Sequence, residues 1–287
     1  ALGDPGDNWP VVASAVLYDP VQRLFVPTGS LATARASHTA TLLPDGKVLV
    51  AGGAGYETSG TLLLLASAEL YDPELGTFTP TGSLPVPCDS HTATLLPSGR
   101  VLIAGGECLE GSYGPGETSA LYDPASGVFA PSGNLLTARE FHTATVLPPG
   151  RDVLIAGGAY WDIPSSAELY ESATGAFLAT GSMTVDRRFH TATLLPTGKV
   201  LFTGGETTSD RWSGIFTMSG PDLASAELYD PSLGVFTPTE QLATGRSGHT
   251  ATLLLSGDVL IVGGSANGYP LASVEMYDPV AEAFVRR

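Results

Sequence analysis

The sequence predicts an all-β protein built from repeated four-stranded sheets, and three observations point to it. First, the phrase His-Thr-Ala-Thr recurs five times in 287 residues, and each copy is followed by a Gly-Gly pair. Second, a Tyr-Asp-Pro phrase, once degenerate, occurs six times and is followed by a turn and a Phe. Third, the period is near 50 residues, which is typical of β-propeller blades and not of helical solenoids. The His-Thr-Ala-Thr copies begin at His38, His91, His142, His190 and His249.

One repeat shows why each unit is expected to form four antiparallel strands, called a to d from the first to the fourth. Residues 38–43 and 47–50 are β-branched and apolar runs on either side of Asp45-Gly46, which is a strong hairpin signal. Residues 67–71 predict strand c and residues 77–79 strand d, with a turn between them. The Gly-Gly pair after strand b marks a position where only a residue without Cβ fits.

Composition excludes several classes of protein. Asp and Glu number 29 against 13 Lys and Arg, a net charge of -16, so nucleic acids and anionic membrane surfaces are expected to be poor partners. No apolar run approaches the ~18 residues that span a bilayer, and no cationic segment followed by an apolar one opens the sequence, so we expect any secretion signal to be removed or to lie outside it. Two cysteines exclude a disulfide-dense scaffold and a four-Cys zinc site.

The motifs HTATLLPDGKVLVAGG (38–53) and ASAELYDP (66–73) resemble bacterial kelch repeats, which also occur in the central domain of galactose and glyoxal oxidases. The resemblance covers nearly the whole chain and implies a kelch-type β-propeller. The copper-radical site of those oxidases needs a Tyr cross-linked to Cys and two free His on the metal. All five His here occupy one repeated slot, so we expect that site to be absent and the His to be buried structural residues.

Counting strands predicts a six-bladed arrangement in a single domain, 1–287. Strands c and d occur six times, but a and b only five times, so the first blade is a half blade that carries c and d alone. We expect an upstream segment or another chain to complete it, because a bare inner edge exposes strand backbone. The predicted boundaries are 1–30 for the half blade and 31–83, 84–134, 135–182, 183–241 and 242–287 for the complete blades.

An internal comparison predicts buried ion pairs. Where an Arg stands three residues before the His, a Glu stands two residues before the Tyr of the same blade, and both are absent in the blade of Cys88 and Ala120. A semi-buried guanidinium without its partner is costly, so we interpret the pairs as structural. The alternative is an Arg ring that grips acidic peptides, as in kelch adaptors of ubiquitin ligases. The predicted pairs are Arg35 with Glu69, Arg139 with Glu168, Arg187 with Glu227, and Arg246 with Glu275.

The two cysteines belong to the blade that lacks the ion pair. The a–b hairpin places Cys88 within about one residue of being opposite Cys108. A disulfide there could replace the missing pair, whereas the alternative is two small buried thiols.

The b–c loops are the part of the repeat that varies. With strand a innermost, these loops share one face with the d–a links, and variation on one face often marks a binding face. The loops contain all three Trp and the four Tyr that are not landmarks, together with ten acids. The alternative is that these rings only pack long loops onto the propeller. The predicted ligand-binding residues are Tyr56, Tyr113, Tyr160, Trp161, Asp162, Trp212, Phe216 and Tyr269.

An acidic, aromatic face suits a saccharide, a cationic group or a protein partner. The leading hypothesis is a non-enzymatic, extracellular or cell-surface module that binds a glycan or protein. The alternative is a kelch-propeller enzyme, similar to a sugar epimerase or oxidase, that uses loop carboxylates. No cofactor is expected, although Asp4 with Asp7, or Glu206 with Asp210, could ligate calcium.

Overall fold

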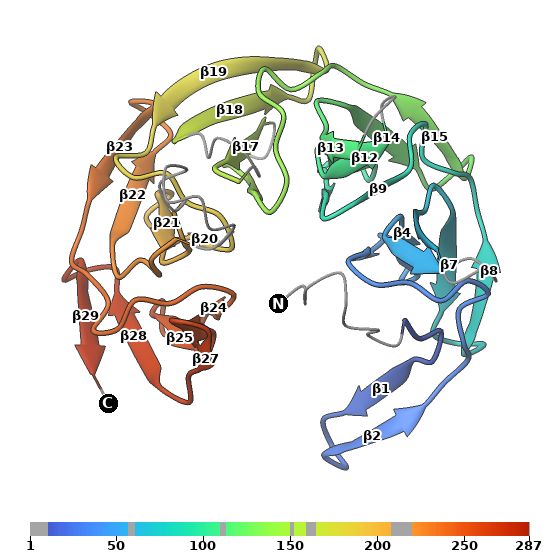
Figure 1. Cartoon of the computed structure of the whole chain (residues 1–287), viewed down its shortest axis with the longest axis horizontal. Coiled ribbons are helices and arrows are strands. Elements are labelled where there is room, and N and C mark those ends of the chain that lie inside the picture. Colours follow the sequence, from blue (N-terminus) through green and yellow to red (C-terminus); the bar gives the residue numbers. More distant parts are fainter. Residues whose placement is uncertain are drawn as a thin grey trace. The chain divides into compact units, whose positions relative to one another are not determined.

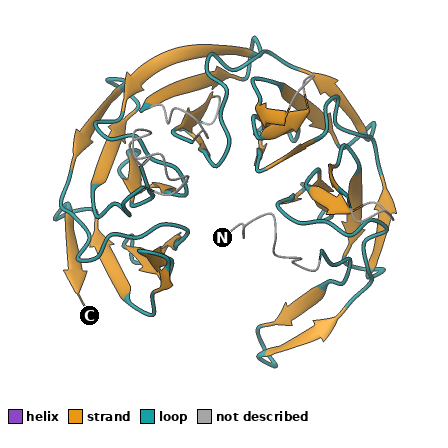
Figure 2. Ribbon diagram, in the orientation of Figure 1, coloured by secondary structure: helices purple, strands orange, loops and turns teal. Residues whose placement is uncertain are grey.

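The computed structural model describes residues 11–56, 61–109, 113–149, 152–158, 165–207 and 220–286, and all regular structure in these ranges is β-strand (Figures 1 and 2). The all-β prediction is thereby confirmed. The chain divides into two compact units, residues 1–133 and 134–287. The predictions of a single domain and of six blades stay predictions.

The main sheets described in the first unit are one two-stranded and two four-stranded antiparallel sheets, in the order expected from the repeat. The two-stranded sheet pairs β1 (Val16–Asp19) with β2 (Leu24–Pro27). The next sheet runs β3 (Thr39–Leu42), β4 (Val48–Ala51), β7 (Ala68–Asp72) and β8 (Thr77–Pro80). The last runs β10 (Thr92–Leu95), β11 (Val101–Ala104), β14 (Ser119–Asp123) and β15 (Val128–Pro131).

The second unit contains three four-stranded sheets with the same internal order. The first runs β16 (Thr143–Val146), β17 (Asp152–Ala156), β18 (Ser166–Glu171) and β19 (Ala176–Ser182). The second runs β20 (Thr191–Leu194), β21 (Val200–Thr203), β22 (Ala226–Asp230) and β23 (Val235–Pro238). The third runs β24 (Thr250–Leu253), β25 (Val259–Val262), β28 (Val274–Asp278) and β29 (Ala283–Arg286).

Short strands occupy the beginnings of the b–c loops and, in one blade, the d–a link. Four of them form two hairpins, β5 with β6 and β26 with β27, and three form a small sheet in the order β13-β12-β9. They are β5 (Ala54–Tyr56), β6 (Leu62–Leu64), β9 (Cys88–Asp89), β12 (Glu107–Leu109), β13 (Tyr113–Pro115), β26 (Ser265–Ala266) and β27 (Tyr269–Pro270).

Within each unit, consecutive sheets pack with their first strands together: β3 contacts β10, and β20 contacts both β16 and β24. Apolar residues of strands b and c fill the interfaces, and Val101 and Tyr122 are fully buried in the cluster of the first unit. The Tyr of the Tyr-Asp-Pro phrase is called the landmark Tyr, and its hydroxyl forms a hydrogen bond with a Thr at the end of the preceding sheet. An example is Thr81 Oγ1 with Tyr122 Oη at 2.9 Å. The repeated landmarks therefore hold neighbouring sheets together.

The connections of a sheet fall into two groups, as expected from the alternation of strand direction. At one end the d–a link bridges to the start of the b–c loop, for example Ala36 to Ala54. At the other end the a–b turn meets the c–d turn, where Lys47 Nζ lies 3.3 Å from Asp72 Oδ2. The end with the b–c loops is called the loop face below.

Candidate functional site

Four buried Arg–Glu pairs stabilise the loop face, one in each complete blade except the blade of Cys88. Their shortest N···O distances are 2.6–3.0 Å, and each Arg side chain is fully buried. The structure brings together Arg35 with Glu69, Arg139 with Glu168, Arg187 with Glu227, and Arg246 with Glu275.

Arg139 shows how such a pair joins three segments of a blade. Its Nη1 donates to the carbonyl oxygens of Gly157, at 2.8 Å, and Ser166, at 3.2 Å, while Nη2 donates to Glu168 Oε1 at 2.6 Å. Glu168 also accepts the backbone N–H of Leu136 at 2.6 Å. Burial lowers the pKa of Arg139, and Glu168 opposes that shift. Every polar group of this ion pair is thus engaged inside the blade, which leaves no guanidinium face for a ligand.

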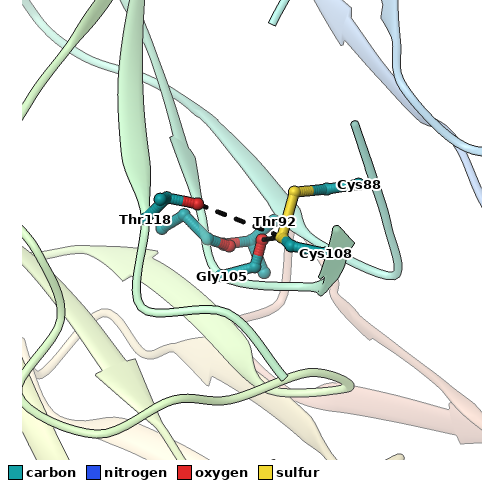
Figure 3. Close-up of a disulfide and its surroundings, with 6 residues drawn as sticks. Cys88, Thr92, Gly105, Cys108 and Thr118 are labelled. Atoms are coloured by element: carbon teal, nitrogen blue, oxygen red, sulfur yellow. Dashed lines mark hydrogen bonds between the residues drawn. A yellow bond between two sulfur atoms is a disulfide. The ribbon is translucent and has the colours of Figure 1, made fainter. Parts of the chain in front are cut away.

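In the remaining complete blade a disulfide takes this position. Cys88 and Cys108 lie directly opposite each other on β9 and β12, both are buried, and their sulfur atoms are bonded (Figure 3). Thr118 Oγ1 lies 4.0 Å from Cys108 Sγ. At the Glu slot of this blade stands Ala120, which is also buried. The disulfide therefore ties the d–a link to the b–c loop, whereas Arg and Glu elsewhere tie the d–a link to the end of strand b and to strand c.

The residue two positions before the repeated His, which directly follows the Arg or Cys, is buried or half-buried in every complete blade, but its identity differs from blade to blade. It is paired with the residue that directly follows the Gly-Gly pair, through β9–β12 or an isolated bridge. The pairs are Ala36 with Ala54, Asp89 with Glu107, Arg188 with Glu206, and Ser247 with Ser265. Glu140 occupies the slot in the blade whose opposite position lies outside the described residues. A repeated frame therefore presents a different pair in each blade.

The next residue along the chain adopts the left-handed backbone conformation in all five blades, with φ between 50 and 60°. This conformation is unfavourable for a bulky side chain, and such residues cluster at functional sites. Within each unit the N–H of this residue donates to the carbonyl of its equivalent in the preceding blade: Phe189 N to Phe141 O at 3.3 Å, and Gly248 N to Phe189 O at 2.9 Å. The five residues are Ser37, Ser90, Phe141, Phe189 and Gly248.

In the second unit these positions form an aromatic and charged cluster. The half-buried Phe141 and Phe189 rings pack against each other with centroids 4.3 Å apart and an interplanar angle of 38°, and the Arg188 guanidinium carbon lies 5.3 Å from the centre of the Phe189 ring. Arg188 also donates to Glu206 Oε1, with a shortest distance of 2.7 Å. Arg188 therefore contacts the Phe189 ring and the Glu206 carboxylate at the same time. This cluster, Phe141, Arg188, Phe189 and Glu206, is the candidate binding site.

The b–c loops of the second unit meet beside this site. Asp222, from the loop that also holds Glu206, accepts the backbone N–H of Asn267 from the next loop at 2.6 Å. Glu206 bridges to Asp222, and burial, with the charge of Asp222, raises the pKa of Glu206 against the effect of Arg188. A hydrogen bond thus links the described parts of two neighbouring b–c loops.

In the first unit the corresponding pair is acidic. Burial, with a smaller contribution from the charge of Glu107, raises the pKa of Asp89 to about 6, and burial raises that of Glu107. Asp89 Oδ1 is buried without a hydrogen-bond partner. Among the described residues no three His, Cys, Asp or Glu side chains come together as a metal site. Asp4, Asp7 and Asp210, the other residues considered for calcium, lie outside the described ranges.

The predicted ligand-binding residues are only partly described. Tyr56 ends β5 and Tyr269 begins β27, both on the loop face and both exposed. Tyr113 begins β13, but its side chain is outside the description. Tyr160, Trp161, Asp162, Trp212 and Phe216 lie outside the described residues, so whether they converge stays a prediction.

Sequence reasoning missed the stacked pair Phe141 and Phe189 and the neighbouring Arg188. A signal was present, because all three lie within a few residues of the repeated His and differ from the equivalent residues of other blades. Comparing every slot of the repeat, and not only the loops, would have found them.

Four of the five repeated His are buried as expected, and the expectation is wrong for His38. His91, His142, His190 and His249 are buried, and His91 Nε2 lies 2.9 Å from Thr39 Oγ1 of the preceding sheet. Burial lowers the pKa of His91 and of His249 to about 4, so both are neutral at pH 7. His38, in the blade that follows the half blade, is exposed.

Comparisons with known proteins agree with the repeat and with the all-β fold. The family model described as "Kelch motif" matches residues 246–286. The human protein "Kelch-like protein 33" is 32% identical over 102 residues, which are 36% of this chain and 18% of that protein. The solved structure titled "Structure of YjhT" matches with a TM-score of 0.75 at 11% identity, over 96% of this chain and 91% of that chain. At this identity the likeness concerns the fold. No membrane-spanning helix occurs in the described part of the chain.

Proposed function

Because the chain is a kelch-repeat protein with a propeller fold, we propose that it is a non-catalytic binding module whose loop face holds a protein or glycan partner. Kelch propellers are in general binding or scaffold modules. Fold alone does not specify a ligand, so the proposal depends on the site.

The observation that carries the proposal is the contrast between neighbouring slots. The Arg–Glu pairs and the His recur from blade to blade and are engaged in ion pairs and hydrogen bonds within the protein. The next two residues sit on the same frame but change from blade to blade, with backbone strain at the second. Residues required only for folding have no reason to vary while their neighbours repeat, so we assign the varying ones to recognition.

The chemistry of the second unit favours an apolar or planar group. The half-buried rings of Phe141 and Phe189 offer a preformed aromatic surface, and aromatic residues with Arg are the usual anchors of protein interfaces. The same surface suits the apolar face of a sugar ring. The exposed Tyr269 and the predicted Trp161 and Trp212 would extend it.

Binding is preferred to catalysis because the described loop carboxylates of this site have structural partners. Glu206 is paired with Arg188, and Asp222 accepts an N–H from Asn267. Both carboxylates are therefore engaged in contacts within the protein. The enzyme alternative would depend on carboxylates such as Asp162 and Asp210, which lie outside the described residues.

We place this module outside the cell or at its surface. The buried Cys88–Cys108 bond supports that assignment, because structural disulfides persist in oxidising compartments and are rare in the cytosol. Secretion can be tested by fractionating the native host and probing the fractions with an antibody.

The binding proposal is tested on a glycan and peptide array with the wild-type chain, Phe189→Ala and Trp161→Ala. Leu233→Ala is the matched control, because Leu233 is an exposed apolar residue in a c–d turn, away from the loop face. We expect the first two variants to lose at least about tenfold in affinity for the same hits, and the control to lose none. Hits that survive both substitutions would contradict the assignment of the loop face.

A further inference from the structure

We propose that Asp89 and Glu107, which lie opposite each other on the loop face of the first unit, bind the guanidinium group of an arginine side chain from a protein partner. Because this assignment names the chemistry of the partner, it rests on the proposed function. The two residues belong to the first unit and are separate from the candidate binding site of the second unit.

The first observation is that two carboxyl groups face each other without a cation. Asp89 on β9 is directly opposite Glu107 on β12, so both side chains lie on the same side of the small sheet, where like charges repel. Asp89 is 6% exposed, and its Oδ1 atom is buried without a hydrogen-bond partner. The ion pairs among the described residues include neither carboxyl. A buried polar atom of this kind calls for a partner that the described part of the chain does not supply.

The second observation is that the equivalent pair of another blade holds a guanidinium. Arg188 stands at the slot of Asp89, and an isolated bridge joins it to Glu206, which stands at the slot equivalent to that of the other acid. The Nη2 and Nε atoms of Arg188 lie 2.7 and 2.9 Å from Glu206 Oε1, and Arg188 is 4% exposed. The backbone frame therefore accommodates a buried guanidinium beside the carboxylate of this slot. In the disulfide blade the carboxylate is kept but a second acid replaces the arginine, so we infer that the cation comes from a partner.

The third observation is that small side chains stand beside the two carboxyls. In the second unit the residues that follow the variable slot are Phe141 and Phe189, whose rings pack against each other. In the first unit the same positions hold Ser37 and Ser90, with the same backbone hydrogen bond from Ser90 N to the Ser37 carbonyl at 3.1 Å. The variable slot of the preceding blade holds Ala36. The space that two rings fill in the second unit is therefore not filled by these side chains, and a planar cation can approach there.

The surroundings of the pair favour arginine over lysine. Glu107 is half-buried, and Leu109, two residues later on the same side of β12, is 41% exposed. The pair is thus reached from the surface at Glu107, and Leu109 offers an apolar contact to the aliphatic part of an arginine side chain. A guanidinium is planar, weakly hydrated and donates parallel N–H groups to a carboxylate, which an ammonium group does not.

A metal ion fits the pair less well than a guanidinium. Calcium takes about 6–8 oxygen ligands. Among the described residues no third acidic side chain joins the two carboxyls in a group that could hold a metal. The net charge of -16 also attracts a cationic segment of a partner to the chain.

The test compares N-acetyl-arginine methylamide with the corresponding citrulline compound, which has the same shape but no charge, and with the lysine compound. Binding to the full chain is measured by NMR titration. We expect the arginine compound to bind at least about tenfold tighter than the citrulline compound, and tighter than the lysine compound, because the charge-assisted hydrogen bonds are lost or weakened. A peptide array in which each arginine peptide stands beside its citrulline copy tests whether a protein supplies the group. We expect the hits to lose at least about tenfold in affinity in the citrulline copies.

Asp89→Arg is the decisive variant, because it copies the arrangement of Arg188 with Glu206 and fills the site from within. It should abolish the binding of the arginine compound. It should also be more stable than Asp89→Arg with Glu107→Gln, which leaves the new cation unpaired. Glu107→Gln alone should weaken binding at least about tenfold. Glu117→Gln is the matched control, since Glu117 is an exposed acid of the same b–c loop, and it should leave binding unchanged.

Four results would overturn the proposal. They are equal binding of the arginine and citrulline compounds, equal binding of the lysine compound, binding that survives both Asp89→Arg and Glu107→Gln, and binding of the arginine compound without any arginine-dependent peptide hit, which would assign the pair to a small molecule. Tighter binding of calcium chloride that Glu107→Gln abolishes would assign the pair to a metal, and would overturn it too.

The outcome for the binding function is read from other residues. Array hits that require Phe189 but neither Asp89 nor Glu107 contradict this site alone and leave the proposed function in place. Hits that survive substitution at all three positions contradict both.

Discussion

The blades 84–134 and 135–182 have the same strands and turns, but different contacts join the d–a link to the rest of the blade at the loop face. This contact, a disulfide in the first and an Arg–Glu pair in the second, is called the fastening below. In the second, Arg139 and Glu168 join the d–a link, the end of strand b and strand c through a buried charged network. In the first, the Cys88–Cys108 bond joins the d–a link to the b–c loop, and Ala120 replaces the Glu. Each complete blade thus has a contact that holds the d–a link at this point, and that contact need not be an ion pair.

The comparison explains why the ion pairs are poor candidates for ligand binding. If the Arg residues formed a functional ring, one blade would not replace its Arg with a disulfide. A covalent bond also removes the desolvation penalty that a buried pair must overcome. The variable slot beside each fastening is free of this requirement and can carry Asp89, Glu140 or Arg188.

The largest effect is expected from Glu168→Ala. It leaves the fully buried Arg139 without its carboxylate and leaves the N–H groups of Leu136 and Thr137 unpaired, so the free energy of unfolding should fall by about 3–5 kcal/mol. Chemical denaturation followed by tryptophan fluorescence measures it.

The control is Arg139→Met together with Glu168→Leu. Because no charge is left buried, the double variant should lose less than Glu168→Ala alone. Equal losses would remove the claim that the two residues act as a pair.

The next effect is expected from removing the disulfide by Cys88→Ala with Cys108→Ala. The bond closes a loop with a sequence separation of 20, so the loss should be about 3 kcal/mol under non-reducing conditions. Reducing agent should destabilise the wild type and leave this variant unchanged, as thermal unfolding can show.

Grafting the other fastening sharpens the comparison. Cys88→Arg with Ala120→Glu and Cys108→Ala places the Arg–Glu combination in the disulfide blade. We expect it to be more stable than Cys88→Arg with Cys108→Ala, which buries an unpaired Arg. If Ala120→Glu gives no recovery, the two fastenings are not interchangeable.

Much of the fold could be predicted because every repeat carries the same local signals. His38 to Gly53 contains two apolar runs, a hairpin turn and a glycine pair, and the structure places β3 and β4 there. A Cβ on Gly53 would lie 2.5 Å from the Ala36 carbonyl oxygen, which explains the second glycine. The Arg–Glu pairs were also readable, because their joint absence in one blade is a comparison within the sequence.

The candidate site was less accessible from the sequence. The stacking of Phe141 on Phe189 depends on left-handed backbone conformations that nothing in the residue type indicates. The raised pKa of Asp89 depends on its burial beside Glu107. The register of β9 with β12 places these two residues opposite each other. Both are consequences of tertiary packing and not of local propensity.

Substitution of Asp89 tests the variable slot of the disulfide blade by pH. The folded protein holds the Asp89 proton more tightly than the unfolded chain, since its pKa is raised to about 6, so this group loses stability as the pH rises from about 4 through 6. Asp89→Asn should therefore be more stable than the wild type above pH 6, by roughly 2 kcal/mol. The difference should vanish below about pH 4.

His91 provides the internal reference in that experiment. Its pKa is lowered to about 4, so its contribution is lost in the opposite direction, as the pH falls from 6.5 through 4. Since both proteins contain His91, it cancels in their difference. A difference between Asp89→Asn and the wild type that does not change with pH would contradict the raised pKa.

The smallest effect concerns the links between sheets, which should not depend on the fastening within them. Tyr71 Oη bonds Thr28 at 2.8 Å in the sheet with Arg35 and Glu69, and Tyr122 Oη bonds Thr81 at 2.9 Å in the disulfide blade. Tyr71→Phe and Tyr122→Phe should each cost about 1 kcal/mol, because one buried hydrogen bond is lost while the ring still packs. Denaturation curves of the two variants, each recorded with and without reducing agent, measure both costs. If each variant loses the same free energy of unfolding with and without reducing agent, the contacts between sheets are independent of the fastening within a sheet. If the loss for Tyr122→Phe grows when the disulfide is reduced, the two are coupled.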